Sequence, residues 1–377
     1  MKFTIKRNRL IDSVQDVTKA VSSRTTIPIL TGIKMIATDE GLTFTGSDSD
    51  ISIESFIPNE ENGEVIVEVQ ETGGIVLNAK YFSEIVRKLP MDTVEFEVFN
   101  HLQTIIRSGT AEFNLNGLDP DEYPFLPQIP EDNVFSLPTD LLKSIIRQTV
   151  FAVSTSETRP ILTGVNWMVE NNRLTCTATD SHRLAMRTAP IEIVGETLQA
   201  VIPGKSLVEL SKILDGSNDM VDIVITDNQI LFKFKNLLFF SRLLEGNYPD
   251  TSKLIPTDYK TQLVLPSKEF LHAIDRASLL SRGDRNNVVK LVSIDRKQIE
   301  ISSTTPEIGK VVEQIQTESI EGEELKISFS SKYMMDALKA LEETDIRISF
   351  TGAMRPFIIQ SVHDEQILQL ILPVRTF

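Results

Sequence analysis

Three short segments of the sequence repeat one arrangement of charges: a base, an acid four positions later, and a second base three positions after the acid. The residues are Lys80, Glu84 and Arg87; Lys205, Glu209 and Lys212; and Lys332, Asp336 and Lys339. Residues at this spacing lie on one face of an α-helix. A row of exposed cations binds the phosphates of a polyanion such as nucleic acid. The alternative is an ordinary solvated helix face, stabilised by its own ion pairs.

The run Asp180, Ser181 and His182 contains the three residue types of a serine hydrolase. Neighbours on an extended segment point to opposite faces, whereas the members of a catalytic triad converge from separated positions. The sequence has no Gly-x-Ser-x-Gly turn, and its four histidines are too scattered for a zinc site. We therefore expect no catalytic residue, no metal and no cofactor. A hydrolase that uses Asp180 and His182 is the weakest alternative.

The net charge of −15 at pH 7 excludes a protein that is cationic over its whole surface. It does not exclude nucleic-acid binding, because binding depends on where the cations lie rather than on their sum. The single cysteine, Cys176, excludes an internal disulfide framework and favours a reducing compartment. The sequence has no apolar run typical of a signal peptide or a membrane span. We therefore expect a cytoplasmic protein without a membrane partner.

The segments that carry these charges belong to a repeat that extends over the whole chain. Residues 26–32, Thr-Ile-Pro-Ile-Leu-Thr-Gly, return as residues 158–164, Thr-Arg-Pro-Ile-Leu-Thr-Gly. Residues 42–49 return as residues 174–181, and a fainter third copy stands at residues 299–305. These later runs alternate polar and apolar side chains, which is typical of β-strands.

Each repeat is also predicted to open with a strand and an amphipathic helix. Apolar residues at helical spacing occupy residues 10–21, 142–153 and 270–277, and we expect Thr139 and Ser267 to cap the second and third of these helices. The predicted fold class is therefore α+β. It consists of three similar domains, each with two helices packed on antiparallel sheets.

Two Pro-rich passages, residues 117–124 and 245–250, share a Tyr-Pro pair and mark the joints between the repeats. Proline in both passages favours stiff connections over flexible tethers. We expect domains at residues 1–127, 128–256 and 257–377.

Several motifs together resemble the bacterial DNA sliding clamps, the beta subunits of the replicative DNA polymerase. These motifs are the repeated Pro-Ile-Leu-Thr-Gly, the run Ala-Thr-Asp-Ser-His-Arg-Leu-Ala at 178–185, and the ending Leu-Pro-Val-Arg-Thr-Phe at 372–377. The resemblance covers the full length, and the ending with residues 354–357 is similar to the Gram-positive branch. It implies a non-enzymatic processivity factor, a homodimer in which two chains join head to tail as a ring around double-stranded DNA.

The resemblance also implies which residues contact DNA and which join the two chains. The DNA-facing positions that match are Arg24, Lys80, Arg87, Arg159 and Lys205, and the charge repeat alone adds Lys212, Lys332 and Lys339. The joint would match Phe113 and Leu115 at one end of the chain to Leu279 and Leu280 at the other. The acid within each charge pattern is expected to weaken the attraction to phosphate, so that the ring slides. Pro160 and Ile161 stand where other members have an aromatic pair.

A groove between the second and third domains is implied to bind short apolar motifs of the replicative DNA polymerase, the clamp loader and repair proteins. The matching positions are Leu162, Thr179, His182, Arg183, Leu184, Pro249, Lys253, Leu254, Tyr333, Met354, Leu370, Leu372, Pro373, Val374 and Arg375. Lys253 stands where other branches have arginine, which keeps the charge but loses the bidentate geometry. Residues 282–287 lack a phenylalanine that some members have there. The alternative function is an acidic multidomain protein-binding scaffold that does not contact DNA.

Overall fold

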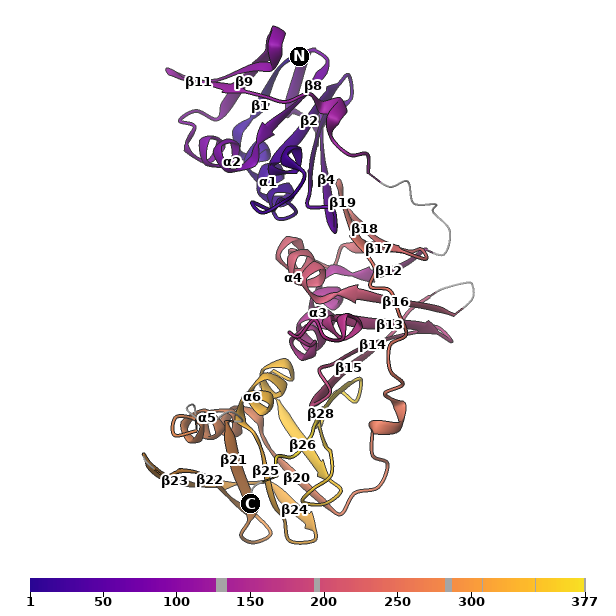
Figure 1. The fold of residues 1–377 in the computed structure, drawn as a ribbon, viewed down its shortest axis with the longest axis vertical. Coiled ribbons are helices and arrows are strands. Elements are labelled where there is room, and N and C mark those ends of the chain that lie inside the picture. Colours follow the sequence, from indigo (N-terminus) through magenta and orange to yellow (C-terminus); the bar gives the residue numbers. More distant parts are fainter. Residues whose placement is uncertain (127–133, 193–196, 282–286, 307, 343, 376–377) are drawn as a thin grey trace. The chain divides into compact units, whose positions relative to one another are not determined.

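The computed structural model describes residues 1–126, 134–192, 197–281, 287–306, 308–342 and 344–375 (Figure 1). The predicted boundary at residues 127 and 128, and most of the stretch 282–287, lie outside these residues. The chain divides into two compact units. The first unit comprises Met1–Asp140 and Glu209–Leu243, and the second comprises Leu141–Val208 and Leu244–Phe377.

The described residues of the first unit form two large antiparallel sheets and a short two-stranded hairpin. The five-stranded sheet has the order β11 (Ala111–Asn116), β10 (Gln103–Ser108), β9 (Thr93–Val98), β1 (Lys2–Lys6), β7 (Val67–Glu71). The eight-stranded sheet has the order β12 (Val134–Pro138), β17 (Met220–Ile225), β18 (Gln229–Phe234), β19 (Leu237–Arg242), β4 (Ile51–Pro58), β3 (Gly41–Ser47), β2 (Gly32–Thr38), β8 (Gly73–Asn78). The hairpin pairs β5 (Glu60–Glu61) with β6 (Glu64–Val65).

The described residues of the second unit form two further antiparallel sheets. The nine-stranded sheet has the order β16 (Leu198–Pro203), β13 (Gly164–Glu170), β14 (Arg173–Thr179), β15 (Arg183–Pro190), β28 (Ile367–Ile371), β27 (Phe357–Ser361), β26 (Asp345–Phe350), β20 (Thr261–Pro266), β24 (Ser319–Gly322). The four-stranded sheet has the order β23 (Gly309–Gln316), β22 (Gln298–Thr305), β21 (Val288–Ser293), β25 (Lys326–Ser330).

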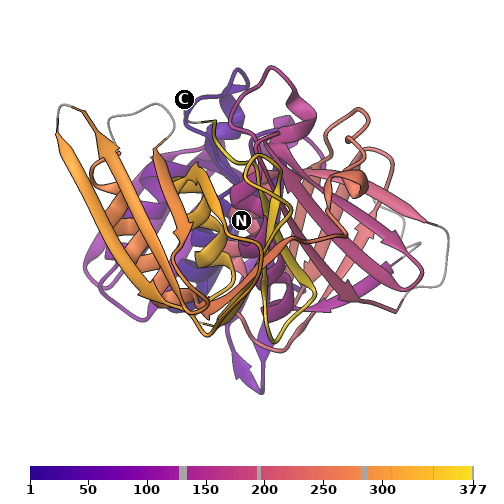
Figure 2. The same cartoon turned by 90° about the horizontal axis from the view of Figure 1, so that it is seen from below.

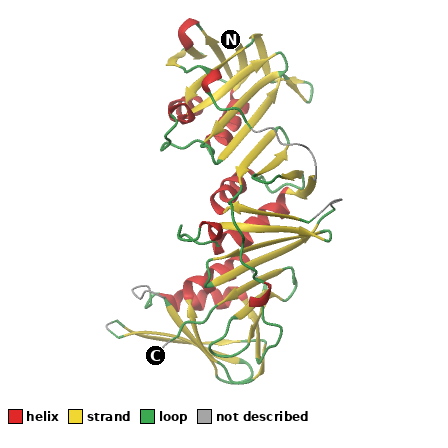
Figure 3. Ribbon diagram, turned by 45° about the vertical axis from the view of Figure 1, so that its right-hand side comes forward, coloured by secondary structure: helices red, strands yellow, loops and turns green. Residues whose placement is uncertain are grey.

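Six α-helices occur in the described part of the chain, two in each repeat as predicted. They are α1 (Arg7–Thr18), α2 (Ala79–Lys88), α3 (Thr139–Thr149), α4 (Gly204–Ile213), α5 (Ser267–Ser278) and α6 (Ser331–Ala340). In the first unit α1 packs beside α2 and contacts strands of both sheets, and in the second unit α5 packs beside α6 in the same way (Figures 2 and 3). The helices form because their apolar residues fall on one stripe, such as Leu10, Val14 and Val17 on α1, all buried.

The eight-stranded sheet and the nine-stranded sheet each join strands from consecutive repeats. In the first unit β4 of the first repeat pairs with β19 of the second, with Ile53 opposite Phe239. In the second unit β15 of the second repeat pairs with β28 of the third, with Ala185 opposite Gln369. Each of these strands would otherwise end a sheet with an unpaired edge, so the pairing covers surfaces that invite aggregation.

The predicted caps at Thr139 and Ser267 are wrong. These residues are the first of α3 and α5, and the Ser267 hydroxyl donates to the Glu342 carbonyl at 2.6 Å. The backbone N–H of the first residue of each repeat's first helix donates to a carbonyl in the loop after its second helix. The pairs are Arg7 to Asp92 at 2.7 Å, Thr139 to Asp219 at 2.8 Å and Ser267 to Thr344 at 3.1 Å. These loops take up one N–H group of each first helical turn that has no partner within the helix.

The Tyr-Pro pairs anchor the connections between repeats through buried phenols. Tyr123 packs in a core cluster with Ile29, Leu30 and Val76 in the first unit. In the second unit Tyr248 packs in the same manner with Leu162 and Val201, and its hydroxyl accepts a hydrogen bond from the backbone N–H of Thr179 at 3.0 Å. Burial raises the pKa of both phenols. The stiff connections predicted from proline are therefore also held by a large side chain at each joint.

Replacing both Tyr123 and Tyr248 by Phe is expected to reduce the fall in the free energy of unfolding that occurs at alkaline pH. A phenol whose pKa is raised on folding keeps its proton in the native state, while the unfolded chain releases it above pH ~10. The free energy of unfolding of the wild type should therefore fall as pH rises past that value. Urea denaturation at pH 8, 9.5 and 10.5 measures this slope. Tyr81→Phe, at an exposed tyrosine, is the control, and an equal slope in the double variant would contradict the argument.

Candidate functional site

The six bases of the repeated charge pattern are all exposed on helices, as the spacing predicts. Lys80 and Arg87 lie on α2, Lys205 and Lys212 on α4, and Lys332 and Lys339 on α6. The apolar residues of α2 do not all lie on its buried side. Phe82 and Val86 are buried, but Tyr81 is 58% exposed, with the Lys80 ammonium 5.8 Å from its ring centroid. Tyr81 therefore lies on the solvent side of the helix, next to Lys80.

The three acids of the pattern are not equivalent, which corrects the prediction of a shared role. Glu84 is exposed and forms no ion pair among the described residues. Glu209 binds Lys212 on its own helix at 2.7 Å. Asp336 binds Arg183 at 2.6 Å and neither lysine of its own pattern. The carboxylate of Asp336 is therefore already neutralised and cannot oppose phosphate binding as the pattern predicts.

The two loop arginines that are predicted to contact DNA are both exposed. Arg24 lies in a turn in which its backbone N–H donates to the Ser22 hydroxyl at 3.1 Å. Arg159 donates from Nη2 to the Ser181 hydroxyl at 2.8 Å. One contact to a serine leaves the remaining donors of the Arg159 guanidinium available to a ligand.

Arg183 was matched to the partner groove, but its side chain is buried and does not line the pocket. It is only 8% exposed, and its guanidinium donates to the carboxylates of Asp180 at 3.0 Å and Asp336 at 2.6 Å and to the Phe151 carbonyl at 2.6 Å. The same group lies 4.6 Å from the ring centroid of Tyr333. The fork of donors is thus used inside the protein, and Arg183 joins the turn 180–183 to α6.

The hydrolase interpretation fails on geometry, although the run is a turn between β14 and β15 and not the extended segment expected. Asp180 accepts hydrogen bonds from the backbone N–H groups of His182 and Arg183 at 2.9 and 3.1 Å. Ser181 accepts from Arg159, and the His182 ring stacks on the Tyr333 ring at 6.4 Å between centroids. The three side chains have separate partners, so they do not form a relay from acid to nucleophile.

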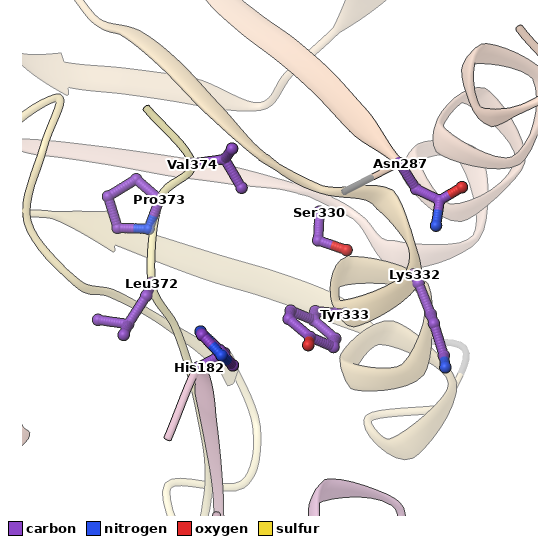
Figure 4. Close-up of a pocket in the computed structure, with 8 residues that line it drawn as sticks. All are labelled: His182, Asn287, Ser330, Lys332, Tyr333, Leu372, Pro373 and Val374. Carbon is purple, nitrogen blue, oxygen red and sulfur yellow. The ribbon is translucent and has the colours of Figure 1, made fainter. Parts of the chain in front are cut away.

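A pocket of about 420 Å³ lies in the second unit beside this turn (Figure 4). Five predicted groove residues line it: His182, Tyr333, Leu372, Pro373 and Val374. Backbone hydrogen bonds from Leu372 to the His182 carbonyl at 2.9 Å and from Val374 to the Ser328 carbonyl at 2.8 Å fix the C-terminal wall. The structure therefore brings the turn, α6 and the C-terminal segment together around one cavity.

The remaining lining residues are Asn287, Ser330 and Lys332, which were not predicted for this pocket. Lys332 was assigned to DNA contacts because its helix repeats the charge pattern of α2 and α4. Asn287 and Ser330 precede β21 and α6 respectively. The hydrogen bond between the Ser331 N–H and the Asn287 carbonyl at 2.9 Å fixes their segments next to each other. No motif in the sequence could indicate that pairing.

The other predicted groove residues do not line this pocket. Leu162 belongs to the core cluster of Tyr248, while Leu184 and Leu370 belong to a second core cluster with Ile358 and Leu368. Thr179 is buried, and its hydroxyl donates to the Arg183 carbonyl at 2.6 Å. Those that remain are exposed on the surface of the second unit: Pro249, Lys253, Leu254, Met354 and Arg375. The three leucines are thus core residues and not part of the pocket lining.

The residues predicted to join two chains lie at or near open sheet edges. In the first unit β11 pairs with β10 alone among the described strands, and it carries the half-buried Phe113 and Leu115. In the second unit β23 pairs with β22 alone, and it carries the exposed Val312. Leu279 is 57% exposed and Leu280 half-buried, directly after α5, which packs on β23. Each unit therefore has a strand with unpaired backbone groups and apolar side chains nearby.

Neither metal ligands nor membrane spans are apparent in the described residues. They contain no group of three or more His, Cys, Asp and Glu side chains placed to hold a metal ion. None of their helices is long and apolar enough to cross a membrane. The thiol of Cys176 is buried, which raises its pKa.

Comparisons with known proteins give one consistent family. The chain matches models of the DNA polymerase III beta subunit: the N-terminal domain over residues 1–127, the central domain over 136–250 and the C-terminal domain over 252–375. It is 68% identical to the beta sliding clamp of Bacillus subtilis over the full length of both chains. Its fold matches the crystal structure of the B. subtilis DNA polymerase sliding clamp with a TM-score of 0.97. A DNA polymerase III beta chain from Streptococcus pneumoniae, 40% identical, matches over both full lengths with a TM-score of 0.95.

Replacing Arg183 by Gln is expected to lower the free energy of unfolding by about 3 kcal/mol, because it leaves two partly buried carboxylates without their cation. Urea denaturation measures the loss. Arg173→Gln, at an exposed arginine of β14, is the matched control and should change it little. A second substitution, Asp336→Asn, should recover part of the loss in the double variant. Equal effects of Arg183→Gln and Arg173→Gln would show that the interaction is not structural.

Proposed function

This chain belongs to the DNA polymerase III beta-subunit family, the beta sliding clamps, and from that premise we propose how its surfaces serve a DNA polymerase processivity factor. Two copies close head to tail into a ring around double-stranded DNA, and the ring tethers the replicative polymerase. The observation that carries the proposal is an exposed base at equivalent positions of helices α2, α4 and α6 in an otherwise acidic protein. The protein acts as a non-catalytic tether, with three domains at residues 1–127, 128–256 and 257–377.

The DNA contacts are proposed to be weak and independent of sequence. Cations that bind phosphates carry no base information and exchange readily, so the ring moves while its closed topology retains it. The proposed residues are Arg24, Lys80, Arg87, Arg159, Lys205, Lys212, Lys332 and Lys339. Lys212 is partly neutralised by Glu209 at 2.7 Å, which weakens its attraction to phosphate. On α6 the corresponding acid, Asp336, binds Arg183 and does not neutralise Lys339. We therefore expect α4 and α6 to attract phosphate with different strength.

The homodimer is proposed to form by pairing of β11 of one chain with β23 of the other. Both strands have one unpaired edge in their own unit. Head-to-tail pairing in both directions closes a twofold ring and leaves neither edge open. The apolar residues Phe113 and Leu115 on one side and Leu279 and Leu280 on the other would cover each other beside the paired strands.

The partners are proposed to dock through the pocket of the second unit. Its wall of Leu372, Pro373 and Val374 and the stacked rings of His182 and Tyr333 suit a short apolar peptide segment. The exposed Leu254 and Met354 extend the apolar surface available on that unit. The polymerase, the clamp loader and repair proteins would share this site and therefore compete for it.

The ring is tested by the topology of the bound DNA. Protein assembled by a clamp loader on nicked circular DNA should stay bound through a wash at high salt. It should leave within the time of the assay when the circle is linearised, because the ends let the ring slide off. Gel filtration of the complex before and after cleavage measures this. Release by salt from both forms would show electrostatic binding without a ring, and no binding to either would favour the acidic scaffold.

The dimer is tested by placing a charge in the proposed interface between β11 and β23, called the seam below. Leu115→Asp should weaken self-association on the order of a hundredfold, because an interface between apolar side chains would bury an unpaired carboxylate. Sedimentation velocity over a concentration series measures the dissociation constant. Phe125→Asp is the matched control, since Phe125 is 90% exposed in the same unit and outside the seam. An unchanged dimer in Leu115→Asp would refute the pairing of β11 with β23.

A further inference from the structure

The first unit contains a pocket of about 810 Å³ where the first repeat meets the second. From the first repeat α1, β4 and β5 line it, and from the second repeat the end of α4, the segment after it, and the turn between β18 and β19 line it. We propose that this pocket binds an arginine side chain of a partner protein segment. The site is separate from the docking pocket of the second unit and would give the clamp an additional contact with a partner.

The first support comes from the equivalent joint of the second unit, where arginines of the second repeat reach across to the third. Arg147 on α3 binds Glu342, which lies just after α6. Arg187 on β15 binds Asp364 in the turn between β27 and β28. Two arginine side chains thus bridge the repeats at that joint.

The first repeat has uncharged side chains at the corresponding positions. The sequence around α1 aligns without a gap with that around α3, with Phe3 opposite Phe135, and all eight residues of β4 align with those of β15. Gln15 therefore stands where the second repeat has Arg147, and Ser55 stands where it has Arg187. Both uncharged residues line the pocket. The pocket thus lies where the second unit has its bridging arginines.

The second support is the charge of the lining. Five of the sixteen lining residues are acids and two are bases. Both bases are already paired: Arg9 binds Glu61 at 2.7 Å, and Lys235 binds acids of the segment after α4. The acids exceed the bases, so a cation that enters the pocket meets a net negative lining.

Two of the carboxylates are available to a guanidinium. Asp12 is exposed, and no described residue forms an ion pair with it. Asp215 follows α4 as Glu342 follows α6, so it stands where an arginine is bound in the second unit. The ammonium of Lys235 is shared between Asp215 and Asp219, which leaves acceptor oxygens on both. A guanidinium has five donors in a planar fork and can bind several of these oxygens at once.

The third support is the apolar part of the lining. Phe234 and Leu237 are buried, Phe56 and Ile213 are half-buried, and all four line the pocket. The methylene groups of an arginine side chain pack on such a surface while its charged end contacts polar groups. The rest of the apolar surface suits a second, apolar side chain. The expected occupant is therefore a segment with arginine next to an apolar residue.

A selection experiment identifies peptides for this pocket. A library of random heptapeptides displayed on phage is selected on wild type and counter-selected on Gln15→Arg. In that variant the introduced side chain should bind Asp215 as Arg147 binds Glu342, and so fill the pocket. The retained peptides should hold arginine next to an apolar residue. They should still bind Asn8→Arg, which adds the same charge at an exposed position of α1 outside the pocket. No retained peptide, or retained peptides without arginine, would overturn the proposal.

Synthetic peptides then measure the role of the guanidinium. A selected peptide is compared by fluorescence anisotropy with counterparts that carry citrulline or lysine in place of the arginine. Wild type should bind the arginine form about 10-fold more tightly than the citrulline form, the effect of one hydrogen bond between charged groups. Asp215→Asn should remove most of this preference, while Asp39→Asn, at an exposed acid between β2 and β3, should keep it. Equal binding of the lysine form would show a site for any cation and would contradict the assignment to arginine.

A further variant separates this inference from the docking function. The selected peptides should bind Leu372→Asp as tightly as wild type, because Leu372 lines the other cavity. Loss of binding in Leu372→Asp would place the peptides in the docking pocket. That result would overturn this inference, whereas the docking function would stand.

Discussion

The bound guanidinium of Arg183 is the interaction on which the geometry of the proposed docking pocket depends. It holds the turn 180–183 through Asp180, the segment after α3 through the Phe151 carbonyl, and α6 through Asp336. The positions of two lining residues of the pocket, His182 and Tyr333, follow from these contacts. His182 lies beside Tyr333 because Asp180 binds the backbone N–H of His182, and because the next residue, Arg183, binds Asp336 on the helix that carries Tyr333. A charge that is buried to this extent is stable only when its donors are satisfied, so these positions cannot vary independently.

Comparison of the first two repeats shows what distinguishes the turn beside this pocket from its counterpart in the first repeat. Ser49 and Ser181 occupy equivalent positions and both have positive φ, 83° and 77°. At the next two positions the first repeat has Asp50 and Ile51, whereas the second has His182 and Arg183. The turn is therefore the same, but only the second repeat has the cation that can bind a neighbouring helix. Tyr123 and Tyr248, in contrast, fill matching core clusters in both repeats.

The helices and the repeat could be predicted because both depend on local periodicity. The spacing of Leu10, Val14 and Val17 determines which face of α1 is buried, whatever the rest of the chain does. The pocket could be predicted only in part. Arg183 was assigned to the partner groove because a sequence does not show that two carboxylates, one of them in another repeat, converge on it. Leu162 was misassigned for the same reason, since a core leucine and a pocket leucine differ only in their distant neighbours.

The pairing of strands from consecutive repeats has a consequence for synthesis on the ribosome. β4 can pair with β19 only after the ribosome has made residues 59–236. Likewise, β15 can pair with β28 only when synthesis is near the end of the chain. At about 5–20 residues per second, each strand edge stays open for on the order of ten seconds or more. Nascent chains in one polysome carry the same open edges at high local concentration. We therefore expect nascent chains to need chaperones that cover these strand edges during translation, although the edges are paired in the folded protein.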